Sequence, residues 1–143
     1  MGQYHKVMNL DKKQYLMPHR LGDGLKLMEF GNSAGGVMTG LAILLAVSNG
    51  RGGGDLNADD HEFAPLVGSW GGDRIAIVGD YAEPTDLAPE FEAATIYERC
   101  AEDGDYIDIS AGVRALIEAD GIFTFGPDDG SWIDRTSRFE RPV

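Results

Sequence analysis

The sequence has a single cysteine, Cys100, so it holds no pair from which a disulfide framework could form. Basic residues are also scarce, with 12 Lys and Arg against 24 Asp and Glu, and the formal net charge is -12. Nucleic-acid binding draws much of its affinity from basic contacts to phosphate, and this charge balance argues against that class of protein. The acidity favours solubility and is also typical of proteins from a salt-rich cytoplasm.

The sequence lacks any apolar run near the ~20 residues that a helix needs to cross a bilayer. Residues 1–13 have no basic region followed by an apolar one, and Lys6 stands where a myristoylation motif has Ser or Thr. We therefore expect a cytoplasmic protein that does not attach to a membrane. With 143 residues, the chain is long enough to form one domain, residues 1–143, without support from disulfides or metal ions.

Three kinds of motif that would identify an enzyme are also missing. The Gly-x-Ser-x-Gly turn that carries a hydrolase nucleophile does not occur. The histidines, His5, His19 and His61, do not have the spacing typical of zinc ligands. A glycine-rich loop is present at residues 50–55, but it lacks the Lys and Ser or Thr of a P-loop. These absences favour binding without turnover over catalysis.

The main feature that is present is a glycine-punctuated apolar segment. Residues 37–47 contain one strongly polar side chain and carry apolar residues on every face of a helical wheel, which is typical of a helix that is buried on all sides or covered by a partner. Ser33 as N-cap and Gly50 as the left-handed C′ residue predict a buried helix over about residues 33–49. The alternative is a strand that turns at residues 49–50.

The glycines of this predicted helix need a compensating contact. Gly36 and Gly40 each cost about 1 kcal/mol relative to alanine in a helix interior. We therefore expect both glycines to lie against neighbouring backbone, where a side chain would not fit. Alanine at either position should then destabilise the protein.

Short apolar runs separated by turn residues predict β-strands on both sides of this helix. Residues 4–10 and 14–17 flank a polar turn and predict an opening β-hairpin. Residues 66–70 and 74–80 flank a Gly-Gly-Asp turn and predict a second hairpin. Because residues 75–78 are apolar on both faces, we expect them at the centre of the sheet. Further strands are predicted at residues 25–30, 106–109 and 122–125.

Two further helices are predicted in the second half of the chain. The first begins near Pro89, whose missing N–H suits a first helical turn, and places Cys100 on its buried face. The second begins with Ser110 as its cap and ends before Gly121. A C-terminal arm with three arginines follows at about residues 126–143. This order of elements predicts a single α+β domain with a mixed or antiparallel sheet.

Five segments of the sequence resemble a family of small uncharacterised proteins found in bacterial and phage genomes. The segments read MGQYHKVMNLDKK, GDGLKLMEF, GRGGGD, GDRIAIVGDY and YIDIS, and the resemblance extends to about residue 109. The resemblance implies a single cytosolic domain. It implies no activity, cofactor or catalytic residue.

The glycine-rich loop after the predicted helix is the first candidate site. Its glycines would let backbone N–H groups approach an anion, and its arginine would donate to a phosphate or carboxylate. The end of a helix repels anions, so a flexible exit from the helix is the alternative. The candidate ligand-binding residues are Arg51, Gly52, Gly53, Gly54 and Asp55.

An acidic cluster in the same loop is a candidate site for Mg²⁺ or Ca²⁺. Residues 55–61 begin like a calcium-binding loop, but Asp60 stands where the turn needs Gly, and Leu66 where a bidentate Glu is needed. A hard cation would relieve the repulsion among these side chains, and the alternative is a solvated acidic loop screened by salt. The candidate metal ligands are Asp55, Asp59, Asp60, His61 and Asp80.

Aromatic side chains near predicted strand ends are a third candidate site. They would line a pocket that stacks a base, or they would pack in the core and at its rim. These residues are Tyr4, Tyr15, Trp70 and Tyr81.

Together these features predict a small acidic protein that binds a small anionic metabolite, such as a nucleotide, or a protein partner. The alternatives are a metal-dependent hydrolase or nuclease that uses the acidic loop, and a structural or virion-associated subunit. Self-association is also expected, because a neighbouring copy would cover the apolar helix and pair with the basic arm.

Overall fold

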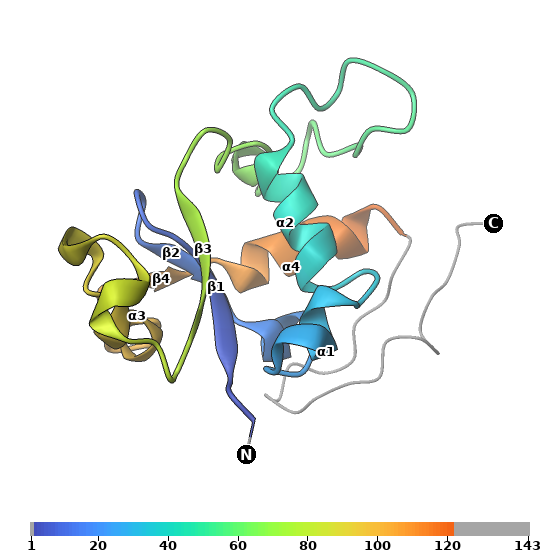
Figure 1. The fold of residues 1–143 in the computed structure, drawn as a ribbon. Coiled ribbons are helices and arrows are strands. Elements are labelled where there is room, and N and C mark those ends of the chain that lie inside the picture. The colour runs from blue at the N-terminus through green and yellow to red at the C-terminus, as the bar shows by residue number, and fades with distance from the viewer. Residues whose placement is uncertain (1, 122–143) are drawn as a thin grey trace.

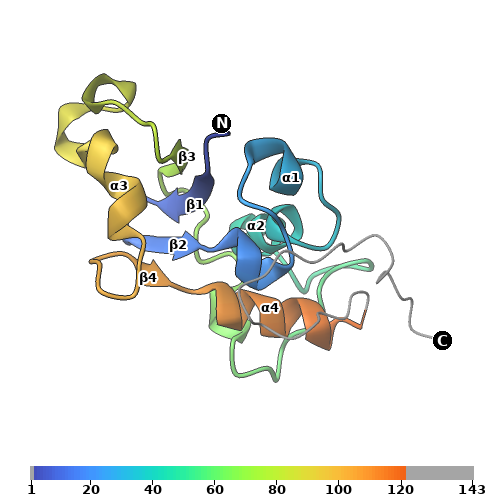
Figure 2. The same cartoon turned by 90° about the horizontal axis from the view of Figure 1, so that it is seen from below.

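A mixed four-stranded sheet lies in the middle of the structure, with helices on both faces (Figures 1 and 2). The structure is a computed structural model, and it describes residues 2–121. The sheet order is β3-β1-β2-β4, with antiparallel pairing of β1 to both neighbours and parallel pairing of β2 to β4. The strands are β1 (His5–Asn9), β2 (Gln14–Leu16), β3 (Ile75–Gly79) and β4 (Ile107–Asp108).

This architecture confirms the predicted α+β class, the mixed sheet and the opening hairpin. Strands β1 and β2 pair with Val7 opposite Leu16. Oδ1 of Asn9 accepts hydrogen bonds from the backbone N–H of Asp11 at 2.9 Å and of Lys12 at 2.8 Å. A side chain at the end of β1 therefore closes the turn. The predicted strand at 122–125 and the arm at 126–143 lie outside the described residues.

The predicted apolar helix is present as α2 (Val37–Leu45), shorter than residues 33–49 at both ends. Ser33 is not its cap. The carboxylate of Asp23 accepts from the N–H of Val37 at 2.8 Å and from the hydroxyl of Ser33 at 2.5 Å. A buried acidic side chain from an earlier turn thus satisfies the first amide of the helix, which local sequence could not show. Gly50 has the expected positive φ of 97° but lies beyond the helix end.

Helix α2 is buried along one face only. Val37 and Leu44 are fully buried, whereas Met38 is 39% exposed and Leu45 is 40% exposed. The prediction of burial on all sides is therefore wrong for the described part of the chain. Apolar residues on every side of a helix show that each side can be buried. How many sides are buried depends on how many other elements pack against the helix.

The predicted second hairpin is wrong, because residues 66–70 form no strand. The backbone N–H of Gly68 donates to the carbonyl of Ile43 at 2.9 Å. The N–H of Trp70 donates to the carbonyl of Leu44, also at 2.9 Å. Carbonyls at the end of a helix have no intrahelical partner, so the segment caps α2 instead of joining the sheet.

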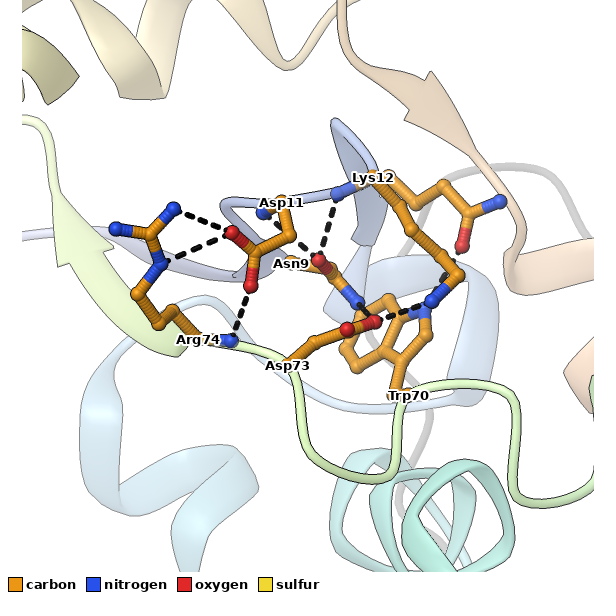
Figure 3. Close-up of polar contacts among 7 residues, drawn as sticks. Asn9, Asp11, Lys12, Trp70, Asp73 and Arg74 are labelled. Atoms are coloured by element: carbon orange, nitrogen blue, oxygen red, sulfur yellow. Dashed lines mark hydrogen bonds and ion pairs between the residues drawn. The ribbon is translucent and has the colours of Figure 1, made fainter.

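Strand β3 is an edge strand, and the prediction that residues 75–78 lie at the centre of the sheet is wrong. It pairs only with β1 within the described residues, and Ile77 is 42% exposed while Val78 is 6% exposed. Polar contacts hold the turn before β3 against the hairpin turn (Figure 3). These include the ion pair of Lys12 with Asp73 and the hydrogen bond from Nε of Arg74 to Asp11 at 2.9 Å.

Residues 25–30, predicted as a strand, contain the short helix α1 (Leu27–Gly31). The backbone N–H of Lys26 donates to the Glu29 carboxylate at 3.0 Å, and the N–H of Glu29 donates back to the Lys26 carbonyl at 2.8 Å. This reciprocal contact starts a helix. Only Phe30 in α1 is buried, so alternating residues do not form a buried strand face.

The two later helices are confirmed as α3 (Ala93–Arg99) and α4 (Ser110–Ala119). The predicted start near Pro89 is wrong, because Pro89 opens a separate 3-10 turn, Pro89–Phe91, before α3. Cys100 follows α3 and is 1% exposed, as predicted. Nζ of the buried Lys6 donates to the Cys100 carbonyl at 2.7 Å, which places a cation at the end of α3. With α1, the described residues hold three α-helices besides α2, rather than the predicted two.

Ser110 opens α4 but is not its side-chain cap, which corrects the prediction. Its hydroxyl accepts from the N–H of Met17 at 2.7 Å, and Asp108 accepts from the N–H of Ser110 at 2.8 Å. Gly121 follows the helix with a φ of 78°, as predicted for the residue past its end. None of the helices in residues 2–121 is long and apolar enough to span a membrane.

The sheet separates two hydrophobic clusters. Side chains of β1 alternate between them, with Val7 facing α2 and α4 and Met8 facing α3. The larger cluster is centred on Leu16, Phe30, Leu44, Trp70, Val113 and Leu116. The smaller cluster contains Met8, Tyr15, Val78, Ile96, Cys100 and Tyr106.

The expected close contacts at Gly36 and Gly40 are present, but they involve side chains and not backbone. A Cβ on Gly36 would lie 2.1 Å from Oδ2 of Asp23, and a Cβ on Gly40 would lie 2.7 Å from Cγ1 of Val113 in α4. We expect Gly40→Ala to lower the free energy of unfolding by about 1 to 2 kcal/mol, because overpacking outweighs the gain in helix propensity. Urea denaturation measures this change, with Gly52→Ala in an open part of the loop as the matched control. A more stable Gly40→Ala protein would contradict the contact.

Candidate functional site

The predicted anion-binding loop already holds a carboxylate of the chain itself. Oδ2 of Asp55 accepts hydrogen bonds from the backbone N–H groups of Gly50 at 2.8 Å, Arg51 at 3.0 Å and Gly52 at 3.1 Å. These bonds, those of Gly52 and Gly50 first, hold the pKa of Asp55 below its ordinary value. The amides proposed to meet an external anion are thus occupied, while Gly53 and Gly54 are exposed beside them.

The predicted metal ligands are not gathered into one site. Asp59 and Asp60 are exposed, and Nδ1 of His61 accepts from the N–H of Phe63 at 3.0 Å. Asp80 lies after β3, where its Oδ1 accepts from the N–H of Tyr4 at 2.9 Å. Residues 2–121 contain no group of three or more His, Cys, Asp or Glu side chains placed to hold a metal ion.

A pocket of about 310 Å³ lies beside the glycine-rich loop, between α2 and the end of α4. Its walls include Ile43 and Ile117, and its ionisable side chains are the carboxylates of Asp55 and Asp120. Two carboxylates repel an anion, so this pocket does not suit the predicted class of ligand.

A second pocket, of about 350 Å³, lies where the parallel strands β2 and β4 end and α4 begins. Crevices beyond the carboxyl ends of parallel strands are frequent ligand sites, and this volume is within the range of small-molecule pockets. Its lining includes Tyr15, Arg20, Glu102, Tyr106, Asp108 and Ala111. We call it the β4–α4 pocket.

Tyr15, a buried residue, contributes to the lining of the β4–α4 pocket. Its side chain is 4% exposed, and no residue in the described part of the chain hydrogen-bonds its hydroxyl. Burial, followed by the charge of Asp108, raises the pKa of Tyr15 to about 12. The hydroxyl therefore keeps its proton near neutral pH and remains able to donate a hydrogen bond to a ligand.

Arg20 and the first turn of α4 supply positive potential to the same pocket. Nε of Arg20 lies 3.0 Å from Oδ2 of Asp108, and Oδ1 of Asp108 accepts from the N–H of Ser110. Both oxygens of that carboxylate are thus engaged. The first amides of a helix have no intrahelical acceptor, so the amides near Ala111 can meet an anionic group beside the guanidinium of Arg20, which is itself paired with Asp108. Glu102 at the exposed rim is the second carboxylate of this lining, and the pocket differs from the first one in also holding a cation, Arg20.

Among the predicted aromatic candidates, only Tyr15 lines this pocket. Trp70 is fully buried in the core, whereas Tyr4 and Tyr81 are 45% and 56% exposed. The sequence analysis missed Arg20 and Asp108. Their closeness depends on the parallel pairing of β2 with β4, which sets Tyr15 beside Asp108. The one local signal is the order of a strand, Asp108 and a helix that begins two residues later.

Comparisons with protein-family models, curated proteins and solved structures give no match for this chain.

Proposed function

We propose that this protein binds a small anionic metabolite, such as a nucleotide, in the β4–α4 pocket without turning it over. The observation that carries the proposal is Tyr15, a buried residue whose hydroxyl has no hydrogen-bond partner among residues 2–121 and which lines a pocket of about 350 Å³ at the start of a helix. The anionic group of the ligand would face Arg20 and the first turn of α4, and a polar group would accept from Tyr15. Glu102 favours a ligand that also carries a hydrogen-bond donor.

The chemistry of the pocket supports binding over catalysis. A nucleophile is activated by a lowered pKa or by an adjacent base. The nearby Cys100 is buried, and burial raises the pKa of its thiol to about 12, so the thiol stays protonated. Tyr15 has a pKa raised to a similar value and is a poor base at neutral pH.

Adenosine monophosphate is a suitable probe for this proposal. At ten times its Kd, binding is expected to raise the melting temperature by about 5 °C. Tyr15→Phe removes only the hydroxyl and should weaken the Kd about five-fold, because one hydrogen bond contributes about 1 kcal/mol. Thermal shift titrations measure the melting temperature and the Kd. The same titrations with inorganic phosphate and with adenosine test the two parts of the probe separately.

The matched control is Tyr81→Phe, which removes the same atom from a tyrosine that is 56% exposed and does not line the pocket. Its Kd should equal that of the unchanged protein. Equal affinities of the Tyr15→Phe and unchanged proteins would place the ligand elsewhere. A lack of any shift with all three probes would count against the anionic class.

A further inference from the structure

The outer edge of β3 presents backbone groups, most of which have no partner among residues 2–121. Two hydrogen bonds, from the N–H of Leu10 to the Arg74 carbonyl at 2.8 Å and from the N–H of Asp80 to the Tyr4 carbonyl at 2.9 Å, fix which residues face β1. In an antiparallel ladder, alternate residues point their N–H and C=O groups to opposite sides. Ile75, Ile77 and Gly79 therefore point these groups away from β1.

Nothing in residues 2–121 pairs with this edge. Neither Ile75 nor Ile77 makes a backbone hydrogen bond on the open side, and the Gly79 carbonyl accepts only from the N–H of Ala82 at 3.2 Å. In Figure 1, β3 lies in front of β1, and Figure 2 places β3 at the outer limit of the sheet. Ile77 at the middle of this edge is exposed and Ile75 is half-buried, whereas Gly79 is buried with the side chain of Gln3 against it, so Gln3 has to move aside for Gly79 to pair.

Strand β3 also lacks the features that usually protect an edge. It contains no Pro and no charged residue, and Ile77 is 42% exposed on it. Natural sheets blunt such edges with short strands, charges, prolines or bulges. The opposite edge of the sheet is protected by a short strand, because β4 is only 2 residues long.

We propose that β3 pairs with β3 of a second copy of this chain, in an antiparallel register centred on Ile77. This register sets Ile77 opposite the partner's Ile77 and Ile75 opposite the partner's Gly79. All of these residues point their backbone groups to the open side, so the pairs are of the hydrogen-bonded kind. About four interchain hydrogen bonds form even if the Gly79 carbonyl keeps its contact with Ala82. The two sheets then become one sheet across a two-fold axis.

Charge complementarity favours this register over its neighbours. It places Arg74 directly opposite the partner's Asp80, and the two-fold axis repeats the pair. The contacts of Arg74 to Asp11 use its N–H, Nε and Nη2, its guanidinium also lies over the ring of Phe91, and the contact of Asp80 to Tyr4 uses Oδ1. Nη1 of Arg74 and Oδ2 of Asp80 are thus left to meet. Opposite charges directly across a strand pair are favourable, and like charges are not.

Apolar contact at the centre adds to the same arrangement. The exposed side chain of Ile77 lies on the same sheet face as its pairing partner Val7, the face of the larger cluster, and would pack there against the partner's Ile77. The partner that suits this edge is therefore a second copy of the chain, because β3 is complementary to an antiparallel copy of itself. This surface differs from the apolar helix and basic arm that the sequence suggested, and it is independent of the β4–α4 pocket.

Sedimentation velocity of the full chain at micromolar concentration tests the proposal. We expect a dimer for the unchanged protein and a folded monomer for Ile77→Pro, because proline removes an N–H that faces away from β1 and leaves the intrachain ladder intact. Ile77→Val keeps the N–H and most of the side chain, so it should remain dimeric. Circular dichroism confirms that the Ile77→Pro monomer is folded. A monomeric unchanged protein, or an Ile77→Pro dimer, would overturn the proposal.

A cysteine cross-link tests the register itself. Opposed residues of a hydrogen-bonded antiparallel pair have Cα atoms about 5.5 Å apart, a distance that a disulfide spans. Under mild oxidation, Ile77→Cys should give a covalent dimer on a non-reducing gel. Ile75→Cys is the matched control, since its own copy lies opposite Gly79, and it should not cross-link. The native Cys100 is buried and should not contribute. Equal cross-linking of both variants, or none in Ile77→Cys, would overturn the register.

Discussion

Trp70→Ala is expected to lower the free energy of unfolding by about 3 to 5 kcal/mol, a large share of the stability of a small domain. The Trp70 side chain is fully buried in the larger cluster. Its indole N–H donates to Gln14 in β2 at 2.8 Å, and its backbone N–H donates to the carbonyl of Leu44 in α2. One residue, through its side chain and its backbone N–H, therefore joins the sheet, the segment before β3 and the end of α2.

Two variants separate the parts of this effect. Trp70→Phe keeps most of the ring and loses the indole N–H, so it should cost less than Trp70→Ala. Tyr81→Ala removes an aromatic ring that is 56% exposed, and it should change the free energy of unfolding by less than about 0.5 kcal/mol. Urea denaturation of the three variants gives these values. If Trp70→Ala proves as harmless as Tyr81→Ala, the burial described above is wrong.

Raising the pH from 9 to 12 is expected to destabilise the protein strongly. Burial raises the pKa of Cys100 from 9.0 to about 12 in the folded protein. The folded state then keeps a proton that the unfolded state loses, so the contribution is fully present below pH 9 and is lost as the pH rises through 12. A shift of this size corresponds to a loss on the order of 4 kcal/mol. Tyr15, whose pKa rises from 10.0 to about 12, adds a loss of the same sign above pH 10.

The matched variant is Cys100→Ala, because it removes the thiol that titrates first. Between pH 9 and 10, the free energy of unfolding of the unchanged protein should fall, while that of Cys100→Ala should stay nearly level. Lys6 acts in the opposite direction, because burial lowers its pKa and its neutralisation relieves a penalty as the pH rises. Urea denaturation at a series of pH values measures the slopes, and parallel slopes for the two proteins would exclude Cys100 as their source.

Local patterns were sufficient where the contact that shapes the chain is close in sequence. The opening hairpin is closed by Asn9, within three residues of the amides that it accepts from. Helix α4 has its inward residues at helical spacing and ends before a glycine with positive φ. In these cases the residues that decide the structure lie within one turn of one another.

The errors occur where the deciding partner is distant. The segment at residues 66–70 has a strand composition, but its amides bond to the carbonyls at the end of α2. Asp23 replaces Ser33 at the start of that helix, from a turn far earlier in the chain. The apolar run of β3 suggested a central strand, yet the ion pairs of the preceding turn place it at the edge.

The candidate site shows the same division. The sequence by itself determined the chemical groups, including a glycine-rich loop, an acidic cluster, a buried cysteine and Tyr15 near a strand end. Only the tertiary structure decided which of these groups lie together. Asp55 folds back onto the loop amides, and the acidic side chains among residues 2–121 remain apart. The parallel pairing of β2 with β4 brings Tyr15 beside Asp108, which binds Arg20 at the start of α4. Residues distant in sequence come together only once the strands pair in a particular register. That register is set by which side chains the core buries, and these come from the whole chain.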